Sequence, residues 1–324
     1  MSPPPPAFSP PPFPACPAAP LISQNFLGNG SDAAGYIMGG SATQYNLLDP
    51  LVAGRGMLLT SLGSTGQEGT VELKQRANWK STCACGTQGG GAVVTANITS
   101  GAGTVAGDGV LLALVDSSRQ TPGSTAYVTT STCGVTAVRP QNALILEFTT
   151  RDTTTCAGGN TVDLRLVRTY GASDAPVELV HTRPAANAAN AASCEPSCTL
   201  APYMYSGAWW EAQIFLPTYT PTIASDYEDL RQEVQVFTDG TLRMTLANNS
   251  YVPASFYIVA GGRNSGGAND RNGVANVHVD CVGNTAWVSD NSVAHQYYKS
   301  AAPAAAMPRL ALLAAAHLAL AALQ

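Results

Sequence analysis

Short apolar runs separated by turn residues extend along the chain from about Leu21 to Cys281. In Glu233–Phe237 and Val277–Cys281 every second residue is apolar, which is the period of a β-strand with one buried face. About a dozen such runs without a sustained helical period are typical of an antiparallel β-sandwich. The predicted strands are Gly56–Thr60, Thr70–Gln75, Ala92–Ile98, Gly109–Val115, Ala143–Thr149, Thr161–Val167, Val177–Val180, Trp210–Phe215, Glu233–Phe237, Thr241–Leu246, Ser255–Val259 and Val274–Cys281.

Two local signals add detail to this pattern. The segment Thr238-Asp-Gly-Thr241 lies between two runs, and Asp-Gly favours the type I′ turn of a two-residue hairpin. Ser225 and Glu228 form a capping-box pattern at the start of Ser225–Gln232. That segment is the one helix candidate, and it fits a loop equally well.

Composition supports an all-β fold. Charged residues make up 11% of the chain, against about 25% in ordinary soluble domains. Threonine and valine favour pleated strands, and glycine allows turns with positive φ. The net charge is −5 and no Lys/Arg cluster exceeds two residues, so nothing in the sequence favours binding to a phosphate backbone. We expect no nucleic-acid partner.

The cysteines and sequons indicate an oxidising compartment. The chain has eight cysteines, an even number, and three asparagine sequons at Asn29, Asn97 and Asn248. We therefore predict disulfides and N-glycosylation in an extracellular protein, although two Cys pairs could also form a four-thiolate site. The cysteines are Cys16, Cys83, Cys85, Cys133, Cys156, Cys194, Cys198 and Cys281. The sequence does not fix their pairing; Cys194 and Cys198 are the closest candidates for a local bridge.

The N-terminal residues 1–20 are rich in proline. Proline fixes φ and donates no backbone hydrogen bond, so we expect an extended, disordered arm in polyproline II conformation. The stretches Ser2–Pro6 and Ser9–Pro12 resemble the Ser-Pro repeats of hydroxyproline-rich cell-wall glycoproteins; an unmodified linker is the alternative. No signal peptide precedes the arm, and we expect that the natural N-terminus lies upstream.

The C-terminal residues predict a surface anchor. Beyond residues 286–309, which we read as a spacer, Leu310–Gln324 has only two polar residues, His317 and Gln324. This tail is shorter than the ~20 residues that span a bilayer as a helix. Small residues, a spacer and a terminal apolar tail match a glycosylphosphatidylinositol (GPI) signal. A marginal membrane helix and a retained alanine-rich helix are the alternatives.

Residues 21–285 form the predicted main domain, which resembles the concanavalin A-like lectins and glucanases, above all the L-type (legume-like) lectins. The segments that carry the resemblance are Leu58–Thr60 with Gln67–Thr70, Gly107–Leu112, Ala143–Thr150, Asn160–Asp163, Phe256–Ala260 and Gly266–Val277. The resemblance implies a jelly-roll sandwich that binds carbohydrate without enzymatic activity. It also implies that the first and last strands are adjacent, so that Cys16 could reach Cys281.

The resemblance further implies a sugar site built on loops. Its residues would be Asp108, Gly109, Asn160, Gly267 and Asn269. A carboxylate at Asp108 would accept charge-assisted hydrogen bonds from hydroxyl groups, the asparagines offer donors and acceptors, and the glycines let the backbone approach the ligand. Asp108-Gly109 also fits an ordinary turn, and Gly261–Gly267 a flexible loop.

One position departs from the family. L-type lectins use a Glu and an Asp two residues later to help hold a transition metal and calcium, whereas here Glu147 is followed by Thr149. Threonine is a poor replacement for a bridging carboxylate, so we predict no metal site and no cofactor.

Two other functions remain open. Glucanases of this fold need paired carboxylates, whereas the strand face here carries Glu147, Thr149 and Arg151, so we expect no enzyme. A structural or adhesive matrix protein without sugar binding is the other alternative.

The anchor hypothesis predicts that a GPI-specific phospholipase releases the protein from membranes. The released protein should lack Leu310–Gln324, because attachment of the anchor removes the signal. Mass spectrometry of the released C-terminus is the measurement, and recovery of an intact tail would exclude the anchor.

Overall fold

Antiparallel β-strands make up almost the whole of the described chain. The structure is a computed structural model in which seventeen strands and one short helix are placed. It describes residues 15–26, 35–44, 56–85, 90–101, 109–132, 135–152, 160–171, 176–181, 206–218, 234–246, 251–264 and 270–283. All the strand pairings among these residues are antiparallel.

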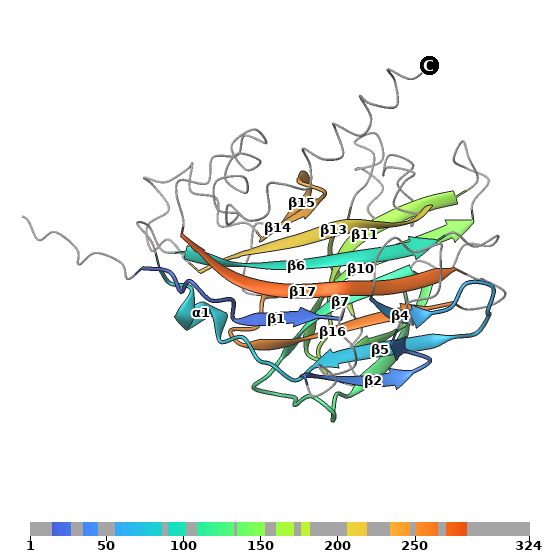
Figure 1. The fold of residues 1–324 in the computed structure, drawn as a ribbon, viewed down its shortest axis with the longest axis horizontal. Coiled ribbons are helices and arrows are strands. Elements are labelled where there is room, and N and C mark those ends of the chain that lie inside the picture. Colours follow the sequence, from blue (N-terminus) through green and yellow to red (C-terminus); the bar gives the residue numbers. More distant parts are fainter. Residues whose placement is uncertain are drawn as a thin grey trace, which may run out of the picture.

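Sheet A has eight strands, and its longest members lie side by side in Figure 1. Their order is β15 (Thr241–Leu246), β14 (Val234–Thr238), β13 (Ser206–Pro217), β6 (Gly90–Gly101), β17 (Arg271–Gly283), β4 (Met57–Thr60) and β3 (Thr43–Gln44), with β1 (Ile22–Asn25) also paired to β17.

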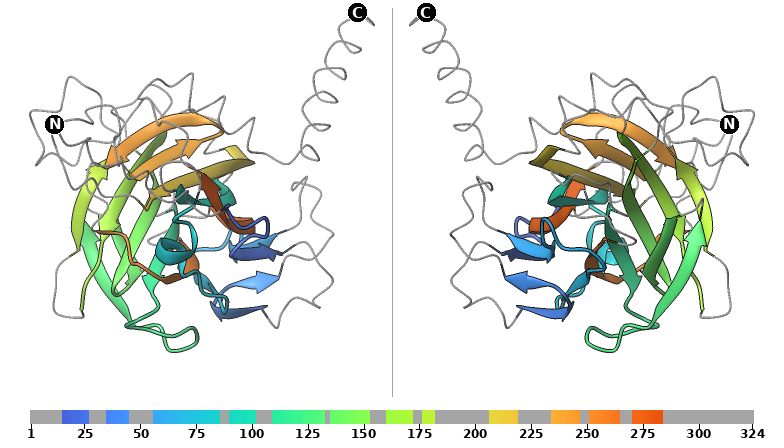
Figure 2. Two further views of the ribbon diagram at one scale, coloured as in Figure 1. Left: turned by 90° about the vertical axis from the view of Figure 1, so that its left-hand side faces the viewer. Right: turned by 90° about the vertical axis from the view of Figure 1, so that its right-hand side faces the viewer.

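Sheet B has seven strands and faces sheet A, as the end-on views of Figure 2 show. Its order is β12 (Val177–His181), β11 (Asn160–Arg168), β10 (Ala143–Asp152), β7 (Gly109–Asp116), β16 (Phe256–Arg263), β5 (Glu68–Leu73) and β2 (Tyr36–Gly40). A separate hairpin of β8 (Tyr127–Thr132) and β9 (Val135–Pro140) and a helical turn, α1 (Trp79–Thr82), complete the elements.

The main core lies between the two sheets. Alternate residues of each strand point into it, so that Phe148 on β10 meets Trp210 on β13 with ring centroids 4.9 Å apart. Both rings are at most 2% exposed. Fully burying an aromatic side chain stabilises a fold by about 1.5–3 kcal/mol, so this contact helps to join the sheets.

Sheet B is also covered on part of its outer face. A second apolar cluster lies there, with Tyr127 of the hairpin packed against Ile145, Val167 and Tyr257. Because β10 is buried on both faces, Ala143–Phe148 reads as a nearly continuous apolar run interrupted by Glu147. Glu147 is the one charged residue of this run, and its side chain lies on the outer face of the sheet.

The predicted all-β sandwich is confirmed, and each predicted strand overlaps an observed one. The predicted hairpin at Asp239-Gly240 is also confirmed, since both residues have positive φ (46° and 75°) as a type I′ turn requires. The helix candidate Ser225–Gln232 lies outside the described residues. The strands that the sequence did not predict are β1, β2, β3, β8 and β9. In the part of the chain that is described, no helix has the length and hydrophobicity to cross a membrane.

Two disulfides link the N-terminal and C-terminal parts of the domain to the segment that follows α1. Cys16 bonds to Cys85, and Cys83 bonds to Cys281. The first and last strands are adjacent as predicted, but the predicted Cys16–Cys281 bridge is wrong. The reason is that the chain leaving α1 passes the ends of β6 and β17, so that the carbonyls of Cys83 and Cys85 both lie near Gly90. Cys133, Cys156, Cys194 and Cys198 lie outside the described residues, and their pairing stays a prediction.

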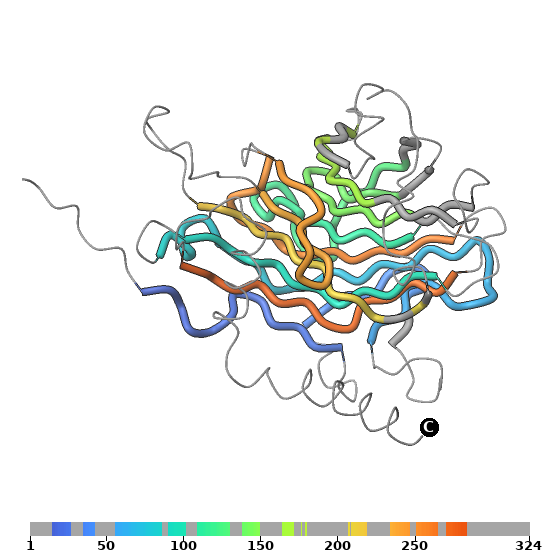
Figure 3. Tube along the Cα trace, turned by 90° about the horizontal axis from the view of Figure 1, so that it is seen from above, coloured from blue at the N-terminus to red at the C-terminus, as the bar shows by residue number. Residues whose placement is uncertain are grey.

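The segments that flank the domain join it at one end. Cys16 and Cys281 both lie at the end of the sandwich where α1 sits, on the left in Figure 1. β17 starts at Arg271, at the opposite end, and twelve residue steps at ~3.3 Å separate Arg271 from Gly283, about 40 Å. The tube view of Figure 3 shows the same long strands from above. We call the end near Cys281 the stapled end.

Glu211 on β13 of sheet A is a half-buried carboxylate whose pKa can be used to test the packing around it. Burial raises the pKa of Glu211, and the nearby charge of Asp239 raises it further. The unfolded chain therefore ionises this group at a lower pH than the folded protein does. Stability is lost as the pH rises through the ordinary value of about 4.5 towards the folded pKa.

Glu211→Gln removes this cost, so the variant should melt roughly 1–3 °C above the wild type at pH 7. Below the ordinary pKa both states carry the proton, and the difference should disappear. Thermal unfolding followed by circular dichroism across this pH range is the measurement. A wild type that is the more stable of the two at pH 7 would contradict the assignment.

Candidate functional site

A pocket opens on the outer face of sheet B, at the end away from the stapled end. It is a small hollow of about 30 Å³ that lies among β5, β7, β10, β16 and the hairpin strand β9. Its lining residues are Glu68, Gly69, Thr70, Gly109, Val110, Leu111, Val138, Glu147, Thr149, Gly261, Gly262 and Arg263.

The register of the strands explains the hollow. Gly261 of β16 lies between Thr70 and Leu111, and in the next row Arg263 lies between Glu68 and Gly109. Strand residues two apart share a face, so each of these rows carries one glycine on the outer face. Without a side chain at Gly261, the sheet surface is open beside Leu111.

Gly109 is the predicted sugar-site residue that lies in the described part of the pocket. Its φ is 94°, and a Cβ at this position would lie 1.9 Å from the carbonyl oxygen of Phe148. The chain therefore enters β7 in close contact with β10, and no other residue type fits without a shift of the backbone. The close approach seen here is between β7 and β10, so the role of Gly109 in ligand binding stays a prediction.

Of the other predicted site residues, only the backbone of Asn160 lies in the described part of the chain. Asn160 begins β11 opposite Asp152, and its side chain lies outside the described residues, as do Asp108, Gly267 and Asn269. The strands next to them are described. Gly109 and Arg263, which border segments 102–108 and 265–269, are registered partners. β10 continues past this row to Asp152, and Asp152 is the registered partner of Asn160 at the start of β11. These strand ends lie at one end of sheet B.

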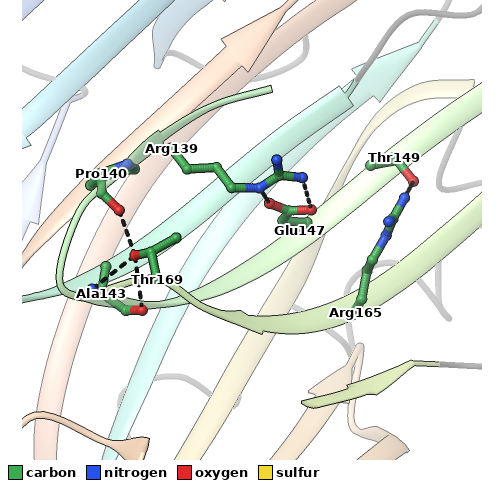
Figure 4. A network of polar contacts seen from close by, with 7 residues as sticks. All are labelled: Arg139, Pro140, Ala143, Glu147, Thr149, Arg165 and Thr169. Carbon is green, nitrogen blue, oxygen red and sulfur yellow. Dashed lines mark hydrogen bonds and ion pairs between the residues drawn. The ribbon is translucent and has the colours of Figure 1, made fainter. Parts of the chain in front are cut away.

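Glu147 contributes a carboxylate to the pocket lining and is paired with Arg139 behind it. Its two carboxylate oxygens accept hydrogen bonds from Arg139, one from Nε and one from Nη2, the latter at 3.0 Å (Figure 4). Arg139 is 0% exposed and Glu147 2%. A bidentate arginine–carboxylate pair is directional as well as strong, so this contact fixes β9 against β10.

A second buried arginine lies beside this pair. Arg165 of β11 is the registered partner of Glu147, and its Nη2 donates to Thr149 Oγ1 at 3.3 Å. It is 0% exposed. Two guanidinium groups therefore lie on this face of the sheet, Arg139 bonded to Glu147 and Arg165 bonded to Thr149 (Figure 4).

These residues do not fit the metal ions that the resemblance implies. Both oxygens of Glu147 are bonded to Arg139, and the Thr149 hydroxyl accepts a hydrogen bond from Arg165. A divalent cation needs free oxygen ligands and would be repelled by both guanidinium groups. Among the described residues, no group of three or more His, Cys, Asp or Glu side chains could hold a metal ion.

A second carboxylate also fixes the base of the hairpin, where Tyr127 lies opposite Pro140 and beside the row of Arg139. Glu72 accepts hydrogen bonds from Tyr127 Oη at 2.7 Å and from Gly123 N and Thr125 Oγ1 at 2.8 Å. Burial raises the pKa of Tyr127, and the hydrogen bond to Glu72 raises it further. The phenol thus stays protonated and keeps donating. This cluster holds the hairpin on the sheet and lies beside the pocket, since Tyr127 also has a hydrogen bond with Thr70 of the lining.

Arg139, Arg165 and Glu72 are polar residues of this region that were not predicted from the sequence. Arg139 lies on β9, one of the strands that apolar periodicity did not predict. Glu72 and Arg165 interrupt predicted strands between apolar neighbours, which places them on the face opposite the main core. That alternation was the available signal, but it does not reveal a partner from another strand.

One sequon lies in the described chain. Asn97 is in the middle of β6, and its Nδ2, the atom that would carry a glycan, donates to Asn276 Oδ1 at 3.0 Å. Asn29 and Asn248 lie outside the described residues. N-glycosylation stays a prediction at all three positions.

Comparison with known proteins gives structural matches only. No family model and no curated protein matches the chain. A legume lectin-like domain from Entamoeba histolytica is similar at 10% identity and a TM-score of 0.47, covering 83% of this chain and 100% of that one. Lectin I-B4 from Griffonia simplicifolia, in its metal-free form, matches at 11% identity and a TM-score of 0.46, covering 80% and 98%. The exoplasmic/lumenal domain of VIP36, with Ca²⁺ and Man3GlcNAc bound, matches at 11% and 0.45, covering 76% and 86%. At such identities and TM-scores, function has to be argued from the residues of this chain.

The geometry at Gly109 predicts a large cost for any side chain. Gly109→Ala combines an unfavourable φ with a contact to Phe148 that requires the backbone to move, so it should cost more than 2 kcal/mol of stability, roughly. Gly63→Ala is the matched control, since Gly63 has a φ of 79° and nothing within 4 Å of the added Cβ. It should cost only about 1 kcal/mol. Denaturant unfolding would compare them, and equal costs would contradict the close approach.

Proposed function

We propose that the chain binds carbohydrate at the pocket end of sheet B. The observation that carries the proposal is the pocket itself, which lies where the strands bordering segments 102–108, 153–159 and 265–269 end. Three connecting segments at one sheet end can supply side chains to a single ligand. Binding residues commonly lie on loops that a rigid scaffold positions.

The lining suits a sugar in its mixture of polar and apolar groups. Thr70, Glu68 and Arg263 provide hydroxyl, carboxylate and guanidinium groups, whereas Leu111 and Val138 are apolar. A sugar ring presents hydroxyl groups at its rim and C–H bonds on its faces, so a small hollow with a few polar groups can receive one edge of it while the connecting segments contact the rest. We assign the remaining contacts to Asp108, Asn160, Gly267 and Asn269 together with the backbone at Gly109.

We further propose that the protein acts at a cell surface or in a cell wall. Disulfides suit an oxidising compartment, and the described domain contains two. Segments 1–14 and 284–324 both join the domain at the stapled end. An attachment through the proline-rich arm or the C-terminal tail would leave the pocket facing away from the surface.

A glycosidase is less well supported. Retaining hydrolysis needs two carboxyl groups about 5–5.5 Å apart that are free to react, and both oxygens of Glu147 are engaged by Arg139. A matrix protein without sugar binding is the second candidate. The double disulfide at the end where both flanking segments attach favours it as a mechanical link.

A glycan array followed by calorimetric titration of the best ligand tests the proposal. Asp108→Ala removes the charged acceptor and should weaken binding ten- to a hundred-fold, about 1.5–3 kcal/mol. The control is Asp116→Ala, at the other end of the same strand, which should bind like the wild type. EDTA should leave the affinity unchanged, because Glu147 is paired with an arginine.

Failure to bind any glycan on a broad array would favour the matrix protein. Equal affinities of Asp108→Ala and wild type would place the site elsewhere on the domain. Release of labelled sugar from β-glucans would instead identify an enzyme.

A further inference from the structure

The resemblance to L-type lectins implies a metal-holding carboxylate at Glu147, and in this structure Glu147 is paired with Arg139. Arg139 belongs to β9, outside both sheets of the sandwich, while Glu147 belongs to β10, an inner strand of sheet B between β11 and β7. Val138, the residue before Arg139, forms the wall of the pocket on the hairpin side. The pair therefore determines where that wall stands relative to the sheet.

We infer that the Arg139 guanidinium takes the place of a divalent cation, as a positioning residue that holds the β8–β9 hairpin and the pocket wall against β10. A metal ion in such a place neutralises a buried carboxylate and fixes the chain around it. Arg139 does both, since it is charged, buried and bonded to both oxygens of Glu147. The inference concerns how the pocket is held and does not require the ligand to be a sugar.

The exchange of metal for arginine excludes the metal. A divalent cation at Glu147 would have to displace Arg139, and the displaced guanidinium would remain buried without its carboxylate. Leaving one partner of a buried pair unpaired is strongly destabilising. Arg165, the registered neighbour of Glu147, adds a second positive charge on the same face and repels a cation further.

The hairpin has two separate attachments to sheet B, and this makes the role of Arg139 testable. Tyr127 of β8 bonds to Glu72 of β5, and Arg139 of β9 bonds to Glu147 of β10. At the base of the hairpin, Thr169 Oγ1 also donates to Pro140 O at 2.6 Å (Figure 4). Loss of Arg139 should therefore release the pocket wall while the Tyr127 attachment stays in place.

Arg139→Ala is the first variant, measured by thermal unfolding and by hydrogen–deuterium exchange of the whole chain. We expect the melting temperature to fall by roughly 5–15 °C, because Glu147 is left buried and unpaired. Exchange should accelerate in peptides covering β9 and the adjoining part of β10, with little change in β6 and β17 of sheet A. The matched control is Arg119→Ala, which removes an exposed arginine paired with Asp116 at 3.7 Å and should change neither measurement.

Chemical rescue separates positioning by a cation from simple packing. Millimolar methylguanidinium should raise the melting temperature of Arg139→Ala, because it can enter the space vacated beside Glu147. It should have no such effect on the wild type or on Arg119→Ala, and sodium chloride at equal concentration should not rescue any of them. Arg139→Lys should recover stability only in part, because an ammonium group cannot make the bidentate contact.

The metal test uses the wild-type protein with Ca²⁺ and Mn²⁺ alone. We expect no heat of binding in calorimetric titration and no change of melting temperature with either ion or with EDTA. Stoichiometric binding of either ion that raises the melting temperature, and that Glu147→Gln abolishes, would overturn the inference. So would an Arg139→Ala variant with wild-type stability, or one whose exchange accelerates equally in every strand.

Discussion

The alternation of side chains along β10 divides one strand between two tasks. Leu144, Leu146 and Phe148 point into the core between the sheets, where Phe148 packs on Trp210. Residues Glu147 and Thr149 point to the outer face, where the pocket lies. Because the period is two, neither set can move without the other. The pocket floor is thus fixed by the same packing that joins the sheets.

Polar groups in a buried site need partners, and here the partners come from one added hairpin. The outer face of sheet B is apolar under Tyr127 and charged at Glu147. The hairpin serves both parts from its base, where the packed ring of Tyr127 on β8 and the bonded guanidinium of Arg139 on β9 lie in neighbouring rows. Its cost is the burial of charge, which an ion pair with two hydrogen bonds offsets only when the geometry is good. This dependence on geometry makes the pair a rigid reference point for the pocket wall.

Much of the fold could be predicted from sequence because alternation and turn chemistry act locally. The run Ala143–Phe148 and the Asp239-Gly240 turn both have signatures within a few residues. The Cys16–Cys85 bridge does not, since it depends on where the chain passes after α1. The sequence showed Glu147 within its apolar run, and Thr149 in place of an Asp led to the prediction of no metal site. It did not show the partner of Glu147, because Arg139 comes from a threonine-rich hairpin with weak apolar periodicity. Gly109 was predicted as a site residue from resemblance; the structure gives it a separate reason to be glycine, its positive φ and its contact with Phe148.

The two disulfides form a covalent shortcut across the domain. Starting from Cys16, the path runs through Cys85, Ala84 and Cys83 to Cys281, and it leaves out all the strands. Tension applied between segments 1–14 and 284–324 would follow this short path, because the remaining chain between Cys16 and Cys281 is slack in comparison. The sheets and the pocket would then carry no load while both bonds are intact. Reduction of Cys16–Cys85 would load the chain from Cys16 to Cys83, which holds β1 to β5, whereas reduction of Cys83–Cys281 would load the chain from Cys85 to Cys281, which holds β6 to β17. The redox state of the surroundings thus decides which part of the domain is exposed to mechanical force.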